Sequence, residues 1–546
     1  MLDYRAKISY NQCNTVYNTI HSISFCETSH EDKQEKAMSK DLCGSTNTIT
    51  KLLRHTAEKY GDKPCIKYIK DDEVISVSYK NFFLHSAAVA SYIKEKHPER
   101  CHVAIIGKTD YEFLVSLNAV FISGNVAVPL ADDRRIEETA ALLNDSDAQV
   151  LLYNAGVGAQ LDELKQNCPQ LNTFVDMDDN ALFAKLFADA ENQPLPSPEY
   201  EQPEECAAII YTSGTSGASK GAMLTSHALV SNVFYREMSF EGEHVALNVL
   251  PLHHIFCFSC DYLKNLKDGV TLCLNGDISN ITQNLLRFEP TFIRLVPMMV
   301  ETLVRRMRII KRNNPDLSPT EAAHRVFGRR LRNIIASGAS LNAAMASELE
   351  EAGITIRQGY GMTETGPRIA VPDGKTCAAS GGRVISICDV RIKDGEIQVK
   401  SPSLMTGYYK KPEETAEVFT EDGWFRTGDM GRLTEDRELF ITGRLKNIIV
   451  LSNGENVSPE EIEKKFAHIP LVKEILVFAH KDRIAADIYP DAEYAEKSGI
   501  TDIEGEISRI VEEINAQDID AREIAVINIQ DSPLPKTPTG KIIRQK

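Results

Sequence analysis

Residues able to bind an anion are densest in the stretch YTSGTSGASKG, which runs from Tyr211 to Gly221 directly behind the apolar run CAAII. Hydroxyl groups can donate hydrogen bonds to phosphate oxygens, and a lysine adds a point charge. Glycines let the backbone approach an anion closely. The stretch therefore predicts a phosphate-binding loop, and its candidate residues are Thr212, Ser213, Gly214, Thr215, Ser216, Gly217 and Lys220.

This predicted phosphate loop does not match the Walker A motif, which ends in Gly-Lys followed by Ser or Thr. The chain has Ser219-Lys220-Gly221 instead, followed by the helix-like SHALVSNVFYREM. We therefore expect a strand, a loop and a helix whose first N–H groups face the anion. A flexible polar linker is the alternative, but a linker is a poor explanation for a loop that follows a buried strand.

A second group of candidate ligands lies in HHIFCFSC, where two histidines precede two cysteines. His253, His254, Cys257 and Cys260 supply the four side chains that a zinc ion requires. Their spacing is wrong for the usual separated ligand pairs, so we do not predict a metal there.

Composition limits the partners and the location of the protein. Asp and Glu outnumber Lys and Arg by 78 to 61 in 546 residues, which argues against nucleic acid or an anionic membrane as the main partner. The twelve cysteines have no regular spacing, as expected for reduced thiols in a cytosol. No apolar run approaches the roughly 18 residues of a membrane helix. We predict a cytoplasmic protein without a transmembrane segment.

The elements that must position these residues follow an α/β alternation from Thr46 onward. The strand-like segments HVAIIG, AAIIYTSG, FIRLVPMM and RNIIASGAS are each followed by a helical pattern, which is typical of parallel sheets with helices on both faces. This predicts a large domain over residues 46–444 that contains two doubly wound α/β subdomains. The site should lie at the carboxyl ends of its strands.

Two further sequence patterns follow along the chain. After Gly381, short alternating strands predict a small β-barrel-like subdomain within the large domain. From residue 445 to 546 we expect a small, mobile α+β domain, in which VSPEEIEKKF begins a helix. Ser458 would be its N-cap, Pro459 its first residue and Glu461 the partner in a capping box. Residues 1–45 are polar and weakly patterned, which predicts a flexible N-terminal extension.

Eight motifs, taken together, resemble those of the adenylate-forming superfamily, which includes acyl-CoA synthetases, luciferases and the adenylation domains of peptide synthetases. The resemblance spans nearly everything from Thr46 to the end of the chain. It implies that ATP converts a carboxylate to an acyl-adenylate, with release of pyrophosphate, before the acyl group passes to a thiol. In chain order the motifs are YTSGTSGASKGAMLT, PLHHIF, SGASL, GYGMTETG, GYYKKPEETAEVF, WFRTGDMG, GRLKNIIVLSNGENVSPEEIE and PLPKTPTGKIIR.

The resemblance assigns roles in the adenylation step. The predicted phosphate loop would grip the β and γ phosphates, Glu364 would hold Mg²⁺, and Thr363 would lie near the α-phosphate. Lys541, in PTGK, would bridge the carboxylate and the α-phosphate. His254 would orient the carboxylate or gate an acyl tunnel, and its neighbour His253 is a weaker candidate.

The resemblance also implies a nucleotide site. Tyr360 would stack on adenine, Asp429 would accept hydrogen bonds from both ribose hydroxyls, and Arg444 would assist at ribose or phosphate. Taken singly, a tyrosine is usually a core residue and an aspartate after glycine usually makes a turn, but their joint occurrence favours binding. The other predicted nucleotide contacts are Ser337, Gly338, Ala339, Gly359 and Gly361.

For the second step, the resemblance implies that the small domain rotates about Lys446 and that Gly454 lines the channel of a pantetheine thiol. The segments LVPMMVETLVRRM and KNIIVLSNGENVSPEEIE most resemble bacterial long-chain fatty acyl-CoA synthetases, although SGASL departs from their usual Gly-Gly-Ala-Pro-Leu. We therefore predict a carboxylate–CoA ligase that uses ATP and Mg²⁺ and acts on a fatty acid. No carrier domain follows the last motif, so the acceptor should be a separate molecule, coenzyme A.

Two alternatives remain open. One is a stand-alone acyl or aminoacyl adenylating enzyme that loads a carrier protein. The other is a non-catalytic nucleotide-binding protein, which the joint presence of Glu364, Asp429, Arg444 and Lys541 disfavours.

Overall fold

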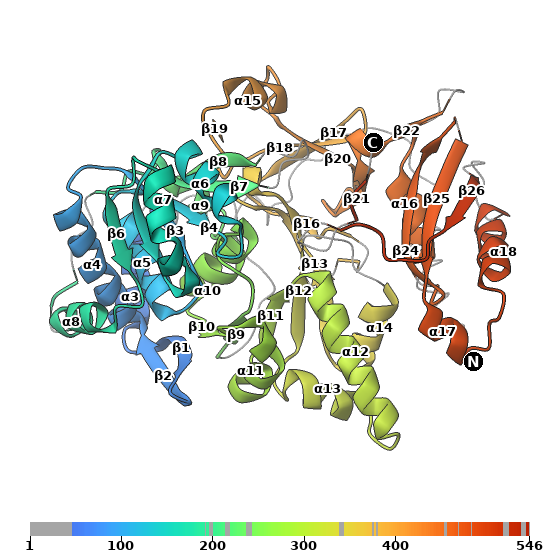
Figure 1. Ribbon diagram of the computed structural model, residues 1–546, viewed down its shortest axis with the longest axis horizontal. Helices are drawn as coiled ribbons and strands as arrows, with labels where there is room; N and C mark the ends of the chain where they lie inside the picture. Colours follow the sequence, from blue (N-terminus) through green and yellow to red (C-terminus); the bar gives the residue numbers. More distant parts are fainter. Residues whose placement is uncertain are drawn as a thin grey trace.

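Two seven-stranded sheets with their helices form the larger part of the structure (Figure 1). A smaller antiparallel unit and a C-terminal unit complete it. The computed structural model describes residues 46–191, 193–195, 200–212, 219–235, 243–337, 343–373, 376–377, 380–451, 456–467, 469–481, 483–516, 523–536 and 542–544. Among these, no helix is both long and apolar enough to cross a bilayer. The cytoplasmic location stays a prediction.

The first sheet has the strand order β19-β8-β7-β4-β3-β5-β6. Five neighbouring strands run parallel to one another, namely β7, β4, β3, β5 and β6. Strand β8 is antiparallel to β7, and β19 is antiparallel to β8. The strands are β3 (His102–Ile106), β4 (Val126–Leu130), β5 (Ala148–Tyr153), β6 (Thr173–Asp176), β7 (Cys206–Thr212), β8 (Lys220–Thr225) and β19 (Gly407–Tyr408). The helices of this part of the chain are α3 (Ile49–Tyr60), α4 (Tyr79–Lys96), α5 (Tyr111–Ile122), α6 (Ile136–Asp145), α7 (Leu161–Asn167), α8 (Asn180–Ala190) and α9 (Ser226–Ser231), with the 3-10 turn η2 (Ala155–Gln160).

The second sheet has the order β13-β12-β11-β9-β10-β1-β2, and only β2 is antiparallel to its neighbour. Its strands are β1 (Pro64–Lys70), β2 (Glu73–Ser78), β9 (Val245–Asn248), β10 (Thr271–Leu274), β11 (Phe292–Leu295), β12 (Asn333–Ala336) and β13 (Thr355–Gln358). Its helical segments are the π-helix η3 (Phe256–Leu263), α10 (Lys264–Asp268), η4 (Ile278–Asn280), α11 (Ile281–Phe288), α12 (Pro297–Asn313), α13 (Pro319–Phe327) and α14 (Ala343–Glu351). The predicted pair of doubly wound α/β subdomains is confirmed.

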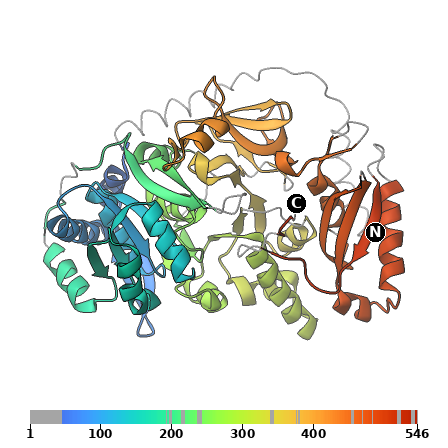
Figure 2. The same ribbon diagram turned by 45° about the horizontal axis from the view of Figure 1, so that its top comes forward.

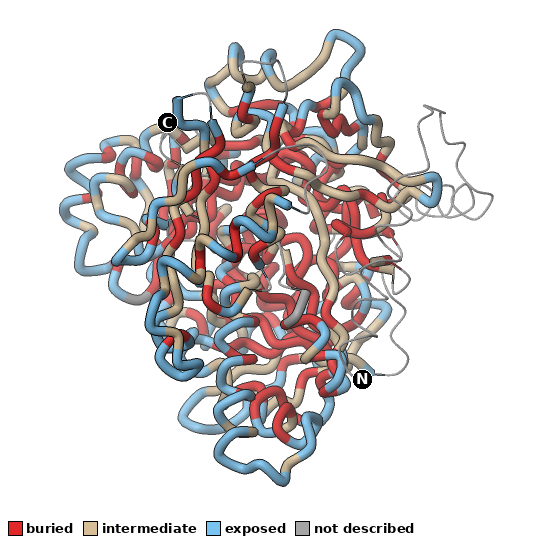
Figure 3. The backbone as a smooth tube through the Cα atoms, turned by 90° about the vertical axis from the view of Figure 1, so that its right-hand side faces the viewer, coloured by how far each residue is buried: buried red, intermediate tan, exposed pale blue. Residues whose placement is uncertain are grey.

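Helix α5 shows why the two sheets form one body. Every residue from Tyr111 to Ile122 is buried except Glu112, because a single hydrophobic core joins residues of both sheets around α3, α4 and α5. A helix covered on all sides has to be mainly apolar, and this one contains only Glu112, Ser116 and Asn118 as strongly polar residues. Asp110 begins it, since its Oδ1 accepts a hydrogen bond from the backbone N of Phe113 at 2.8 Å. Figure 3 shows the buried backbone gathered in the interior of the molecule.

The predicted antiparallel subdomain follows the second sheet and is coloured yellow to orange in Figure 2. It has a four-stranded sheet of order β17-β18-β20-β21 and a three-stranded sheet of order β14-β15-β16. The elements are β14 (Tyr360–Gly361), η5 (Thr363–Thr365), β15 (Arg368–Val371), β16 (Arg383–Val384), β17 (Asp389–Lys393), β18 (Glu396–Lys400), α15 (Pro412–Val418), β20 (Phe425–Leu433), β21 (Leu439–Arg444) and η6 (Leu445–Asn447).

The C-terminal unit has its own hydrophobic core and a three-stranded sheet of order β24-β25-β26. Its elements are β22 (Ile449–Val450), β23 (Asn456–Val457), α16 (Pro459–Phe466), β24 (Val472–His480), β25 (Arg483–Pro490), α17 (Ala492–Lys497), α18 (Ile503–Ala516) and β26 (Ile524–Ile529). The domain boundaries at residues 45 and 444 and the mobility of this unit stay predictions.

One local expectation in this unit is wrong. Helix α16 begins at Pro459 as predicted, but Ser458 makes no side-chain capping bond. Its hydroxyl donates instead to the carbonyl O of Thr442 on β21, at 2.8 Å. The serine therefore ties α16 to the antiparallel subdomain, a tertiary contact that local sequence does not reveal.

Candidate active site

The predicted nucleotide residues gather where strands of the second sheet end. Ser337 follows β12 and Gly359 follows the neighbouring β13. The backbone N of Gly359 donates to the carbonyl O of Ala336 at 3.0 Å, and Ser337 Oγ lies 3.5 Å from the carbonyl O of Gly359. Two adjacent strand ends therefore meet at the edge where ligands of parallel sheets bind. Gly338 and Ala339 lie outside the described residues.

The predicted phosphate loop joins two antiparallel strands. Thr212 at the end of β7 pairs with Lys220 at the start of β8, and Thr212 Oγ1 donates to the carbonyl O of Lys220 at 3.4 Å. Helix α9 begins only at Ser226, so the expected order of strand, loop and helix is wrong. The segment KGAMLT extends as a strand because Ala222 and Leu224 are buried in the sheet. Ser213, Gly214, Thr215, Ser216 and Gly217 lie outside the described residues.

Asp429 is buried and has a donor on each carboxylate oxygen. Tyr360 Oη donates to Oδ2 at 2.7 Å, and Arg444 Nε lies 2.6 Å from Oδ1. Arg444 stands directly opposite Asp429 in the β20–β21 ladder, while Tyr360 comes from β14. Burial, and next the charge of Asp429, raise the pKa of Tyr360. Three of the predicted nucleotide residues thus form one hydrogen-bonded cluster.

Packing requires a glycine at position 361, which is also a predicted nucleotide contact. A Cβ at this position would lie 1.9 Å from the carbonyl O of Pro367, which belongs to the segment that turns back along β14. The backbone of residues 360–362 is therefore held closely against Pro367 and β15, and the turn η5 follows directly. The segment 360–364 carries Tyr360 at one end and Glu364 at the other.

Glu364 is buried in the 3-10 turn η5, beside Thr363. Tyr408 Oη donates to its Oε1 at 2.8 Å. The described residues contain no group of three His, Cys, Asp or Glu side chains that could hold a metal. Mg²⁺ needs only one or two carboxylates when phosphates and waters complete its shell, so the single carboxylate of Glu364 fits such an ion.

His253 and His254 follow β9 and lie side by side, with their Nε2 atoms 3.2 Å apart. Burial, the neighbouring His254 and Arg134 together lower the pKa of His253 to about 3. Loss of solvent around the ring, and then Arg134, lower the pKa of His254, although part of this residue is exposed. Both imidazoles are therefore neutral near pH 7. Cys257 and Cys260 are buried within the π-helix η3.

Two residues near the site were missed by sequence reasoning. Tyr408 lies in the quoted motif GYYKKPEETAEVF, but nothing local indicates its contact with Glu364. Arg134 follows β4, and its buried Nε has no hydrogen-bond partner among the described residues. Its place just after a parallel strand was the signal that could have identified it.

The predicted C-terminal residues are only partly described. Lys446 is exposed in η6. Gly454 and Lys541 lie outside the described residues. On either side of position 541, Lys536 and Ile542 form a β-bridge, which brings the two described flanks together.

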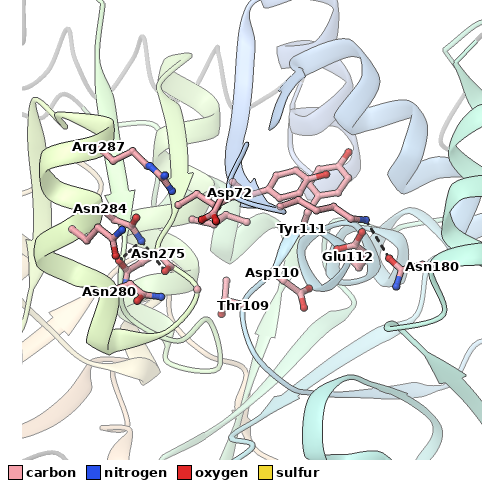
Figure 4. A pocket seen from close by; sticks show the side chains of 16 residues that line it. Asp72, Thr109, Asp110, Tyr111, Glu112, Asn180, Asn275, Asn280, Asn284 and Arg287 are labelled. Atoms are coloured by element: carbon pink, nitrogen blue, oxygen red, sulfur yellow. Dashed lines mark hydrogen bonds between the residues drawn. The ribbon is translucent and has the colours of Figure 1, made fainter. Parts of the chain in front are cut away.

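A separate polar cavity of about 450 Å³ opens between the β1–β2 hairpin, the start of α5 and α11 (Figure 4). Asp110, Glu112, Asn275, Asn284 and Arg287 are among its lining residues. Burial raises the pKa of Asp110 to about 7. None of the predicted site residues lines this cavity.

Comparison with known proteins defines the class. The sequence profile of the AMP-binding enzymes matches residues 53–409, and that of the AMP-binding enzyme C-terminal domain matches residues 446–546. The chain belongs to the AMP-binding enzyme family. Within it, the chain is an AMP-forming acid–CoA ligase of the acyl and aryl group.

Its relatives act on different acids. A long-chain-fatty-acid–CoA ligase of Mycobacterium bovis is 30% identical over 432 residues, which cover 69% of this chain and 70% of the relative. A 4-coumarate–CoA ligase of Arabidopsis thaliana is 27% identical over 512 residues, which cover 89% and 88%.

Solved structures share the fold. An anthranilate CoA ligase in complex with anthranoyl-AMP superposes with a TM-score of 0.77 at 19% identity, over 92% of this chain and 97% of that one. A fatty acyl CoA synthetase of Mycobacterium tuberculosis superposes with a TM-score of 0.66 at 22% identity, over 91% and 97%.

Proposed function

We propose that the protein activates a fatty acid with ATP and transfers the acyl group to coenzyme A. One observation supports this proposal most directly: the short segment 360–364 links two clusters of suitable chemistry. At one end Tyr360 contacts the buried Asp429, and at the other Glu364 contacts Tyr408. A nucleotide whose ribose lies near Asp429 could extend its phosphates toward Glu364 and the start of β8.

In the first step, a carboxylate oxygen attacks the α-phosphorus of ATP and the bond to the β-phosphate breaks, which releases pyrophosphate. We assign Asp429, Tyr360 and Arg444 to the nucleoside, with backbone contacts from Ser337, Gly338, Ala339, Gly359 and Gly361. Mg²⁺, held by Glu364, would supply charge where the phosphates gather. Thr212, Lys220 and the loop residues 213–217 would bind the leaving pyrophosphate, with Thr363 near the α-phosphate.

The carboxylate needs a separate site beside the α-phosphate. We assign His254 to this site, because its lowered pKa leaves a neutral imidazole that can donate one hydrogen bond to a carboxylate oxygen without adding a charge. We assign to Lys541 the role of a cation between the two reacting anions. In the second step the CoA thiolate attacks the acyl carbon and AMP leaves, after the C-terminal domain turns about Lys446 and brings Gly454 toward the thiol.

The fatty acid is proposed because the Mycobacterium bovis relative, a long-chain-fatty-acid–CoA ligase, reaches 30% identity. An aromatic acid is the second candidate, since the Arabidopsis thaliana 4-coumarate–CoA ligase matches over 89% of this chain. A carrier protein as acceptor is a further alternative to CoA.

A single assay separates these functions. The protein is incubated with ATP, Mg²⁺, CoA and, in turn, fatty acids of increasing length, cinnamic acids and amino acids, and AMP and thioester are both measured by mass spectrometry. We expect AMP and acyl-CoA in equal amounts with fatty acids. Preference for a cinnamic acid would establish the second candidate, and AMP release without a CoA thioester would indicate a carrier-protein acceptor. Absence of both products with every acid would refute an enzymatic role.

A further inference from the structure

Tyr408 stands between the lysine at the start of β8 and the carboxylate of Glu364. It belongs to β19, a strand of two residues that pairs with β8 through Tyr408 and Ala222. The backbone N of Tyr408 donates to Thr415 Oγ1 at 2.9 Å, and that of Tyr409 donates to the carbonyl O of Gly221 at 2.8 Å. Figure 1 shows β19 beside β8. The position of the tyrosine is therefore set from both sides.

Its side chain makes one contact to each charged group. The phenol Oη donates to Glu364 Oε1 at 2.8 Å, and Lys220 Nζ lies 5.0 Å from the centre of the ring. The phenol is the donor in this contact, because an ionised carboxylate can only accept a hydrogen bond. A cation over an aromatic face is attracted by the electrons of the ring.

These contacts bear on how the opposite charges of Lys220 and Glu364 are kept apart. An ammonium and a carboxylate in one partly buried site attract each other strongly. If they formed a direct ion pair, neither group would be available to bind a ligand. Within the part of the chain that the structure describes, no ion pair joins Lys220 to Glu364; each contacts Tyr408 instead. The phenol donates to Oε1, and no hydrogen bond or ion pair from the other described residues is made to the second oxygen of Glu364, where a cation could bind.

We propose that Tyr408 is a positioning residue, which holds Lys220 by its ring and Glu364 by its hydroxyl and so keeps them apart for a metal–nucleotide ligand. The proposal rests on the proposed function only for the identity of that ligand. It assigns separate tasks to the two parts of one side chain, and the hydroxyl can be removed without the ring.

Two substitutions separate these parts. Tyr408→Phe removes the hydroxyl and keeps the ring, whereas Tyr408→Leu removes both. Tyr409→Phe is the matched control, because its hydroxyl donates to Asp147 Oδ2 at 2.7 Å, away from Glu364. Thermal unfolding of each full-length variant checks that it is folded.

The measurement is binding of Mn²⁺ to the full-length protein, followed by electron paramagnetic resonance in the presence of a non-hydrolysable ATP analogue. We expect Tyr408→Phe to weaken Mn²⁺ binding about tenfold, as loss of a hydrogen bond to a charged group predicts. Affinity for the analogue without metal should stay unchanged in Tyr408→Phe and should fall about threefold in Tyr408→Leu, which loses the cation–ring contact. Tyr409→Phe should match the unaltered protein.

A double variant tests whether Tyr408 affects Mn²⁺ binding through Glu364. Glu364→Gln should weaken Mn²⁺ binding by itself, and adding Tyr408→Phe should then change nothing more. Unaltered Mn²⁺ affinity in Tyr408→Phe, or a further loss in the Glu364→Gln background, would overturn the proposal. If Tyr408→Leu does not fold, Tyr408→Phe and the double variant still decide the matter.

Failure of the proposed function is distinguishable, because the binding assay contains neither a carboxylic acid nor CoA. Formation of no thioester from any acid, together with the expected Mn²⁺ results, would refute the ligase and leave the positioning role of Tyr408 in place.

Discussion

Arg544 and Glu463 join the last described residues of the chain to helix α16, with Nη2 2.6 Å from Oε2. Arg544 also donates to the carbonyl O of Val477 at 2.9 Å. On the other side of position 541, Lys536 Nζ lies 2.6 Å from Glu474 Oε1. Both flanks of the proposed catalytic lysine are therefore fixed to the C-terminal unit.

Arg544→Ala should impair the two half-reactions unequally. Freeing one flank of Lys541 should lower the rate of adenylation about tenfold or more, because small misplacements of a reacting group are costly. Thioester formation from a synthetic acyl-adenylate and CoA should change less than about twofold, since the role proposed for Lys541 is confined to adenylation. Rapid-quench measurements of each step test this.

Two controls accompany that measurement. Arg509→Ala removes an exposed arginine that pairs within α18, and it should affect neither step. Arg544→Lys, which keeps the charge near Glu463, should restore part of the adenylation rate. Equal losses in both half-reactions would show that Arg544 acts on the stability of the whole unit.

Asp429→Asn should weaken ATP binding. The substitution removes the charge that faces Arg444 and one acceptor for the ribose, so we expect a rise of roughly tenfold to a hundredfold in the Kd for ATP. Isothermal titration of full-length protein gives this value. Asp422→Asn makes the same chemical change at an exposed carboxylate paired with Arg391, and it should leave the Kd unchanged. Equal effects of the two substitutions would remove Asp429 from the nucleotide site.

Gly361→Ala should be destabilising because the new Cβ would fall 1.9 Å from the carbonyl O of Pro367. Backbone on both sides would have to move, at a cost of about 3 kcal/mol in the free energy of unfolding. Gly156→Ala is the control, since a Cβ at Gly156 meets no atom within 4 Å. Urea unfolding followed by circular dichroism measures both, and similar midpoints would contradict the prediction.

Asp110 should make stability depend on pH. Burial raises its pKa in the folded protein to about 7, whereas 3.8 is the ordinary value. Between these values the unfolded chain has released a proton that the folded protein still holds, so the free energy of unfolding falls as the pH rises. One such group contributes up to roughly 1.4 kcal/mol per pH unit.

Asp110→Asn isolates this contribution because asparagine can also cap α5. Urea midpoints measured from pH 4 to pH 8 should decline less steeply in the variant than in the unaltered protein. Asp179→Asn, at the start of α8, changes an exposed capping aspartate and should not alter the slope. Parallel curves for the unaltered protein and Asp110→Asn would contradict the raised pKa.

The sequence predicted the alternation of strands and helices because buried strands are continuous apolar runs and helices carry their own caps. It did not predict β8, because KGAMLT stands in the predicted loop that leads from the strand AAIIYTSG to the helix-like SHALVSNVFYREM. Tyr360, Asp429 and Arg444 were identified by motif, and the structure brings them together.

Contacts between distant segments were beyond sequence reasoning. The hydroxyl of Ser458 has a local capping partner in the sequence but bonds to Thr442 in the structure. Tyr408 is 44 residues from Glu364, and β19 is too short to show a strand pattern. Such pairs depend on how separate subdomains meet, which periodicity does not encode.

The short strand β19 also sets the order in which the nascent chain can complete its fold. Lys220 leaves the ribosome 188 residues before Tyr408, as their numbers show. At 5–20 residues per second this is a delay of roughly 10–40 seconds, during which β8 is an open sheet edge. The Lys220 end of β8 therefore gains its neighbouring strand only after all the other strands of the two large sheets have been synthesised.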